Sequence, residues 1–282
     1  PLCDWSSDVC SSDLGAEYYK KPPLINWAVA SSMLATGRRD ECSARLPSAV
    51  AILALGLTLV GVGSVWLGMR GAFLAGVFAV TNLGILEKGR LIEIEAVYVS
   101  LFGVALVCWM ALWLAGRSPW LVWTVPHFFL GLGLLTKGPL HLLFFYLTIA
   151  LVLWRAGRLR DLLAPAHLCG LMIMGALFAA WFVPYLREVS PGVVLEKWSG
   201  EMGSRFGSVD GSGRSTDWLW NVPRGLSNYL PWILFLPALW SSSAQANLTG
   251  RDLALLRGVR LALVLGFFGL SVFPGVAPRY TL

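Results

Sequence analysis

The sequence predicts an all-α protein, a polytopic bundle with about eight membrane segments. Hydrophobic residues make up 56% of its 282 residues and charged residues only 13%, whereas a typical soluble domain has about 25% charged residues. The mean hydropathy is +0.67, and the 14 Trp are of a type that gathers at membrane interfaces. A soluble core of this size could not bury so much apolar surface, so lipid must solvate much of it.

Apolar runs separated by polar or glycine- and proline-containing stretches give the expected order of membrane segments. The first run, 22–35, is too short to span comfortably, and we expect it to lie at the interface or to be partly embedded. The runs expected to cross are 48–69, 71–86, 95–115, 120–136, 138–154, 167–186, one that begins at 229–240, and 259–273. Between them, 187–228 is expected to be a polar external loop.

The two ends of the sequence are expected to be incomplete. Residues 1–14 contain a near-repeat, Ser-Ser-Asp-Val-Cys followed by Ser-Ser-Asp-Leu, and lack the basic and apolar regions of a signal peptide. We therefore expect a non-native leader at 1–14 and a partial membrane domain at 15–282, a fragment that lacks sequence at both ends.

Neither a metal nor a cofactor is expected. The five Cys form no CxxC pair and no Cys/His spacing typical of a metal site. The three histidines, His127, His141 and His167, fall at or near the ends of expected helices, so we expect them to be interfacial residues rather than ligands.

The positive charge has two interpretations. A net charge of +6 could indicate a nucleic-acid partner, but no Lys/Arg-rich run accompanies it. Basic residues that flank membrane helices and contact lipid head groups account for it better. Membrane lipids are therefore expected partners and nucleic acid is not.

Alternating crossings divide the loops into two sets. One set has eight arginines and two acids; the arginines are Arg70, Arg117, Arg155, Arg158, Arg160, Arg251, Arg257 and Arg260. The positive-inside rule, which counts Lys and Arg, does not by itself favour this set as cytoplasmic. The other set includes the long loop and carries mixed-sign, motif-like charge that is typical of a working surface, so we place the eight arginines in the cytoplasm.

All the candidate site residues fall in the second set. Tyr19, Lys20 and Lys21 precede two prolines that start a helix, and the positive end of that helix suits a phosphate; lysines that snorkel to the interface would look the same. Arg45 lies in a charged stretch that a solvated loop would also explain. Glu95 lies close to the membrane, where carboxylates are functional candidates unless they merely sit in the interface.

Arg90, Lys137 and Arg279 complete the motifs on this face. Lys137 follows Leu-Thr and precedes Gly-Pro, so a tight turn holds it, although a single lysine in a turn is usually an anchor. Basic side chains bind phosphate by charge, and a carboxylate can deprotonate an acceptor. The sequence has no nucleotide-binding motif, so a donor phosphate is expected to arrive on a lipid.

These motifs, in this order, resemble those of the C-type glycosyltransferases, in particular the bacterial aminoarabinose (lipid A) transferases and their protein O-mannosyltransferase relatives. The matching stretches are Tyr-Tyr-Lys-Lys-Pro-Pro-Leu, Ala-Arg-Leu-Pro-Ser-Ala, Gly-Arg with an acid at Glu95, and Leu-Thr-Lys-Gly-Pro. The resemblance implies an enzyme of the bacterial inner membrane, with a periplasmic site, that moves sugar from a polyprenyl-phosphate donor to a lipid or protein acceptor with inversion.

The resemblance also implies roles for individual residues. Lys21 resembles the lysine that contacts the donor phosphate, Arg45 the arginine of Arg-Leu-Pro-Ser, and Glu95 a second, catalytic acid. Lys137 matches the lysine of Thr-Lys-Gly-Pro, and Arg205 in the long loop matches more weakly.

The chain departs from the family pattern at one important position. The family's main catalytic carboxylate lies in an Asp-Glu motif upstream of Lys-Pro-Pro, and nothing here corresponds to it, because Asp4, Asp8 and Asp13 belong to the expected leader. We therefore expect the fragment itself to be inactive. Two other classes remain open: a flippase for lipid-linked sugars or another transporter, which would place charges and broken helices near mid-membrane, and a structural membrane subunit without a site.

Overall fold

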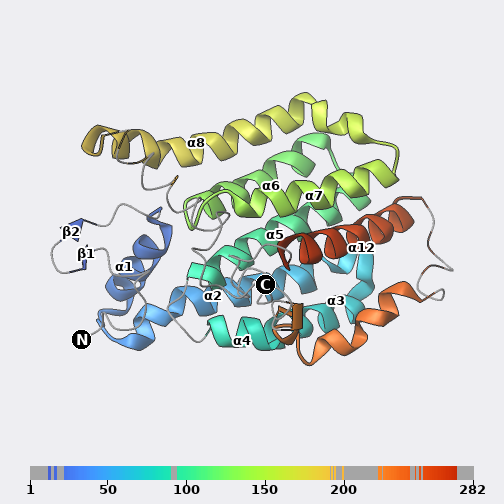
Figure 1. The fold of residues 1–282 in the computed structure, drawn as a ribbon, viewed down its shortest axis with the longest axis horizontal. Helices are drawn as coiled ribbons and strands as arrows, with labels where there is room; N and C mark the ends of the chain where they lie inside the picture. Colours follow the sequence, from blue (N-terminus) through green and yellow to red (C-terminus); the bar gives the residue numbers. More distant parts are fainter. Residues whose placement is uncertain are drawn as a thin grey trace, which may run out of the picture. The chain divides into compact units, whose positions relative to one another are not determined.

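A computed structural model describes residues 12–13, 16–17, 22–89, 94–190, 225–241 and 250–271, with a few single positions between 192 and 248. The helices drawn in Figure 1 are α1 (Leu24–Thr36), α2 (Glu41–Gly61), α3 (Ser64–Thr81), α4 (Leu83–Gly89), α5 (Ile94–Leu114), α6 (Pro119–Leu134), α7 (Leu140–Arg155), α8 (Pro165–Glu188) and α12 (Gly250–Ser271), with the 3₁₀ helices η1 (Leu159–Leu163) and η2 (Trp232–Trp240). Among these residues the only strands are β1 (Ser12–Asp13) and β2 (Ala16–Glu17), an antiparallel pair. The predicted all-α class is confirmed.

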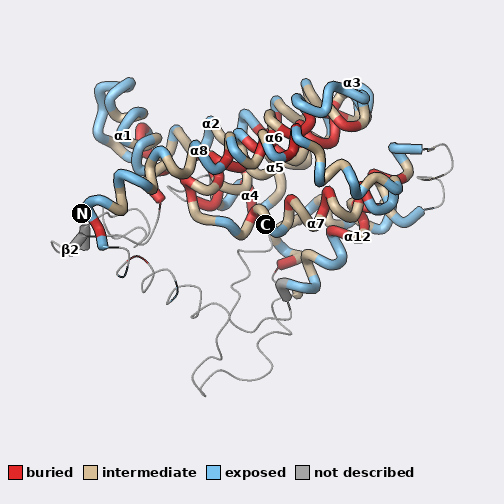
Figure 2. Tube along the Cα trace, turned by 90° about the horizontal axis from the view of Figure 1, so that it is seen from above, coloured by how far each residue is buried: buried red, intermediate tan, exposed pale blue. Residues whose placement is uncertain are grey.

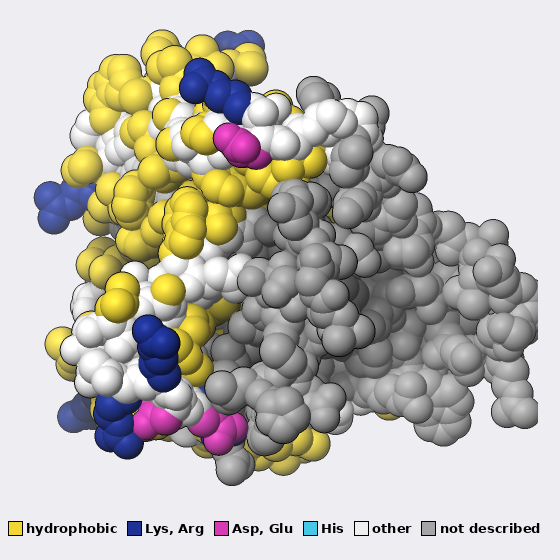
Figure 3. Space-filling view, turned by 90° about the vertical axis from the view of Figure 1, so that its left-hand side faces the viewer, with side chains coloured by type: hydrophobic (Ala, Val, Ile, Leu, Met, Phe, Trp, Pro, Cys, Tyr) yellow, Lys and Arg dark blue, Asp and Glu magenta, His cyan; other side chains and the backbone are white. Residues whose placement is uncertain are grey.

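The chain is a multi-pass membrane protein. Four helices, α2, α3, α5 and α8, are long and apolar enough to cross a membrane, and α1, α6 and α7 are shorter apolar helices. Hydrophobic side chains cover much of the described surface in Figure 3, interrupted by small groups of basic and acidic side chains. Such a surface is stable only where lipid covers it.

The predicted span 48–69 begins too late. Helix α2 starts at Glu41 and contains Pro47, which has no N–H to give to the carbonyl four residues earlier, that of Ser43. The Ser32 hydroxyl of α1 donates to that carbonyl at 2.6 Å instead. The contact from α1 therefore lets the helix continue through a proline that the sequence alone marks as a boundary.

The expected boundary near residue 70 is also displaced. Helix α2 ends at Gly61, and α3 then runs through Arg70 with a non-helical Gly68 (φ 67°, ψ 167°). The backbone thus breaks twice, before Ser64 and at Gly68, a conformation that glycine adopts without a steric penalty.

The C-terminal boundaries require a similar correction. Helix α12 begins at Gly250, before the expected 259, so Arg251, Arg257 and Arg260 lie on a helix and not in a loop. Arg260 is buried, with 8% of its surface exposed. The run expected to begin a span at 229–240 is a 3₁₀ helix from Trp232 to Trp240 that contains Pro237.

The chain forms two compact units. In the first, α5 packs against α6 and α2, and α2 packs against α1 and α3; α5 and α6 carry most of its buried residues (Figure 2). In the second, α12 approaches α7 so closely that a Cβ at Gly258 would lie 2.6 Å from the Cα of Val152. Close approach at small residues is typical of helix packing in membranes.

The expectation that the histidines are interfacial is wrong. His127, His141 and His167 are 0%, 2% and 7% exposed. The His127 Nδ1 lies 2.6 Å from the carbonyl oxygen of Trp123, and the His127 and His167 rings are 5.3 Å apart. Backbone oxygens and neighbouring rings thus give these polar side chains partners inside the first unit, which makes their burial tolerable.

Candidate functional site

The first unit contains a buried ion pair. Glu95 lies in the first turn of α5, and Lys137 lies in the turn between α6 and α7. The Lys137 Nζ is 2.6 Å from the Glu95 Oε1, and each side chain is only 8% exposed. A charge so far from water is stable only when it is paired. The tight Thr-Lys-Gly-Pro turn therefore holds its lysine against α5.

The turn that carries Lys137 is tied to its neighbours through the backbone. The N–H groups of Thr136 and Lys137 both donate to the carbonyl of Gly133, at 3.0 and 3.2 Å. Gly138 then takes a φ of 119°, in the region that favours glycine. The Tyr98 hydroxyl donates to the Gly138 carbonyl at 3.1 Å, so α5 contacts the turn at a second point.

The start of α1 meets the same turn. The Leu24 N–H donates to the Leu135 carbonyl at 3.0 Å, and Ile25 packs with Ile94 and Val97 of α5 in a buried cluster. Leu24 closes the Lys-Lys-Pro-Pro-Leu motif. The ends of three sequence motifs that lie far apart in the chain therefore meet at one place: 22–24, the first turn of α5, and 135–138.

Arg45 makes a different contact. It pairs with Glu41, one turn earlier on α2, and both side chains are partly exposed, at 36% and 46%. The nearby Ser43 contacts Ser32 and Thr36 of α1, eight to twelve residues beyond Leu24, or about 12–18 Å along the helix. The structure therefore pairs Glu95 with Lys137 and pairs Arg45 within its own helix.

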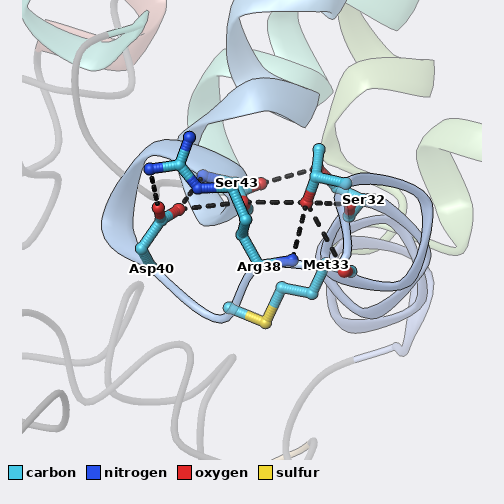
Figure 4. A network of polar contacts seen from close by, with 6 residues as sticks. Ser32, Met33, Arg38, Asp40 and Ser43 are labelled. Carbon is cyan, nitrogen blue, oxygen red and sulfur yellow. Dashed lines mark hydrogen bonds and ion pairs between the residues drawn. The ribbon is translucent and has the colours of Figure 1, made fainter.

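The α1–α2 junction beside Arg45 is a network of polar contacts (Figure 4). Asp40 caps α2 by accepting from the Ser43 N–H at 2.9 Å and the Ser43 hydroxyl at 2.8 Å. Arg38 approaches the same carboxylate at 2.8 Å. The two bonds from Ser43, with a smaller contribution from Arg38, hold the pKa of Asp40 below its usual 3.8.

The other candidate residues lie outside the residues that the structure describes: Tyr19, Lys20, Lys21, Arg90, Arg205 and Arg279. Most of the expected external loop, 187–228, lies outside them as well, although α8 extends to Glu188. Within the described ranges, no group of three or more His, Cys, Asp and Glu could hold a metal ion.

Sequence reasoning missed two polar residues that contact the Lys137 turn. Tyr98 follows Glu95 by three positions on α5, a spacing that puts the two side chains on one helical face, and His141 follows Lys137 by four positions, just after the turn. The His141 N–H donates to the Tyr98 hydroxyl at 2.8 Å. The helical spacing of Tyr98 from Glu95 was the available signal.

Comparisons with known proteins agree with this picture. The family described as dolichyl-phosphate-mannose-protein mannosyltransferase matches residues 20–183. A search of curated proteins finds no match. Two solved structures are similar, both crystal structures of ArnT from Cupriavidus metallidurans at 20% sequence identity. The form bound to undecaprenyl phosphate has a TM-score of 0.78 over 99% of this chain and 50% of that chain. The apo form has a TM-score of 0.68 over 99% and 49%. The chain therefore spans about half the length of that protein and shares its fold.

Proposed function

Because the chain belongs to the dolichyl-phosphate-mannose-protein mannosyltransferase family, we propose that it is part of a membrane glycosyltransferase. The enzyme takes a sugar from a polyprenyl-phosphate donor and gives it to a lipid or protein acceptor. One observation carries the proposal: the buried pair of Glu95 and Lys137 lies where the Lys-Pro-Pro-Leu segment meets the Thr-Lys-Gly-Pro turn. The similar fold of ArnT, which has been crystallised with undecaprenyl phosphate, supports this class of donor.

In this proposal Lys137 binds the donor phosphate together with Lys20 and Lys21, the two lysines that precede Pro22. An ammonium group attracts phosphate as a point charge. Tyr19, Arg90, Arg205 and Arg279 are further candidates for substrate binding, on the resemblance alone. Arg45, paired with Glu41, has a weaker case than Lys137.

Glu95 is the candidate carboxylate of the site. Its Oε1 accepts from the Lys137 Nζ at 2.6 Å, a geometry that favours orienting the ammonium. We therefore assign a positioning role to Glu95.

We place the site at the periplasmic face of a bacterial inner membrane. Glu95 is the second residue of α5 and Lys137 lies in an inter-helix turn, so the charges are at helix ends. A flippase or another transporter would concentrate charge near mid-membrane. The arginines near η1, Arg158 and Arg160, fall on the opposite, cytoplasmic side in this arrangement.

The test is transfer of isotope-labelled sugar from a polyprenyl-phosphate sugar by the full-length protein in liposomes. Lys137→Met should reduce donor use by about tenfold or more, the value of a charge-assisted contact. Lys21→Ala should have an effect of the same kind. Arg158→Ala, which removes an exposed arginine paired with Asp161, is the control and should leave transfer unchanged.

The outcome separates the function classes. A transferase moves the label from the carrier to a new product. If the label stays on the carrier and only crosses the bilayer, the protein is a flippase. If the label neither moves nor crosses in the wild-type protein, both functions are wrong and the chain belongs to a structural subunit.

A further inference from the structure

The Tyr98 hydroxyl connects α5 to the turn after Lys137 and to the start of α7. It donates to the Gly138 carbonyl at 3.1 Å and accepts from the backbone N–H of His141 at 2.8 Å. Tyr98 is three residues after Glu95, so one face of α5 holds the Lys137 side chain through the carboxylate and the backbone that follows Lys137 through the phenol. The residues bound by Tyr98 are one and four positions after Lys137.

The His141 ring connects the end of α6 to the same turn. It is 2% exposed and lies edge-on to the Tyr98 ring, with centroids 5.0 Å apart. Its Nδ1 lies 2.9 Å from the Gly138 carbonyl oxygen and 3.0 Å from the Tyr98 hydroxyl. Its Nε2 lies 3.0 Å from the Leu130 carbonyl oxygen. Carbonyl oxygens only accept and a neutral imidazole has one N–H, so the ring donates to the carbonyl of either Leu130 or Gly138.

A glycine makes room for this ring. A Cβ at Gly133 would lie 2.7 Å from the His141 Nε2, closer than real contacts allow. Gly133 is also the residue whose carbonyl accepts from the N–H groups of Thr136 and Lys137. The last turn of α6 therefore supports the lysine turn and leaves the space that the imidazole fills.

We propose that Tyr98 and His141 are positioning residues that hold the 136–138 turn so that the Lys137 ammonium stays aimed at the donor phosphate. This inference rests on the proposed function. A buried polar network whose members all have partners fixes one geometry, and this network ends on the residues that flank Lys137. A lysine side chain otherwise moves easily toward water, and phosphate binding is strongest when the charge is already in place.

The first experiment measures binding of undecaprenyl phosphate to the purified full-length protein. Tyr98→Phe should raise Kd about threefold to tenfold, the equivalent of one neutral hydrogen bond, and His141→Phe should raise it at least as much. His141→Gln, which keeps a polar group on the side chain, should restore part of the affinity. Tyr146→Phe removes the same hydroxyl from α7 and should leave Kd unchanged.

A double-mutant cycle separates positioning from general packing. In a background of Glu95→Gln and Lys137→Met, Tyr98→Phe should no longer change Kd, because Tyr98 acts through Lys137. Equal effects in the two backgrounds would show that Tyr98 contributes only to packing and would overturn the proposal. An unchanged Kd in Tyr98→Phe would overturn it as well.

The second experiment does not depend on the ligand. An amine-reactive reagent followed by mass spectrometry measures how fast Lys137 is acylated. Tyr98→Phe and His141→Phe should raise the rate at Lys137 severalfold and leave Lys88, on α4, unchanged. If wild-type protein fails to bind undecaprenyl phosphate, the proposed function is wrong, and the acylation rates still decide whether Tyr98 and His141 hold Lys137. Unchanged acylation would refute the positioning role.

Discussion

Removing Lys137 alone should destabilise the protein more than removing Lys137 and Glu95 together. Each side chain is 8% exposed and the two charged atoms are 2.6 Å apart. Lys137→Met removes the ammonium that lies against a nearly buried carboxylate. Breaking one side of a buried pair typically costs about 3–5 kcal/mol, whereas replacing both partners with neutral side chains is often close to neutral. We therefore expect a coupling energy of about 3 kcal/mol.

The assay is reversible unfolding in mixed micelles, followed by the fluorescence of the 14 Trp. Four proteins are compared: wild type, Lys137→Met, Glu95→Gln and the double variant. The pair of Arg158 and Asp161 provides the control cycle, because its atoms are as close, at 2.8 Å, but the side chains are 41% and 28% exposed. An exposed pair of this kind should couple by less than about 1 kcal/mol.

The result that refutes this reasoning is additivity. If the two single variants at 95 and 137 add to the double variant within about 0.5 kcal/mol, the charges do not interact in the folded protein. The reasoning also fails if the two cycles give the same coupling energy, because burial would then make no difference.

Three further outcomes follow from other contacts. Gly258→Ala should lower stability by about 1–3 kcal/mol in the same unfolding assay, because its Cβ would meet the backbone of Val152 at 2.6 Å and force α12 from α7. The Ser43 bonds lower the pKa of Asp40 from 3.8, so their contribution to the free energy of unfolding is complete above that pH and is lost as the pH falls through the lower folded pKa. Asp40→Asn should remove this part of the acid dependence when unfolding is measured over a pH series. Arg158→Cys should react with an impermeant thiol reagent only after cells are opened, and labelling of intact cells would invert the proposed topology.

The fold class was predictable because lipid leaves few options for an apolar chain. Only closed hydrogen-bonded structures cross a bilayer, and apolar runs of helical length therefore locate the helices. Their ends were harder to predict, since tertiary contacts decide them. The Ser32 hydroxyl takes over the carbonyl that Pro47 leaves open, and no rule on the local sequence of α2 could reveal a donor in the preceding helix.

The candidate site was also predictable only in part. Alternation of crossings put Glu95 and Lys137 on one face, and the structure brings them into contact. The same argument placed Arg45 on that face, but a glutamate one helical turn away was available as a partner, and a local pair forms without closing a long loop. Tyr98 was missed and His141 was expected at the membrane interface, because a single tyrosine or histidine in an apolar helix carries no motif.

The cost of burying the Glu95–Lys137 pair bears on why it is there. Two apolar side chains of similar volume would join α5 to the turn at least as firmly, because removing two charges from water offsets most of their attraction. Stability therefore gives no reason for an ion pair at this position, whereas an anionic ligand that binds the Lys137 ammonium does. An arriving phosphate competes with Glu95 for the ammonium, and a lysine already held in place needs little reordering to exchange one anion for the other. On this reasoning the pair is the resting form of a phosphate site. Stability and undecaprenyl phosphate binding should then diverge in the double variant at 95 and 137, with stability largely kept and affinity reduced.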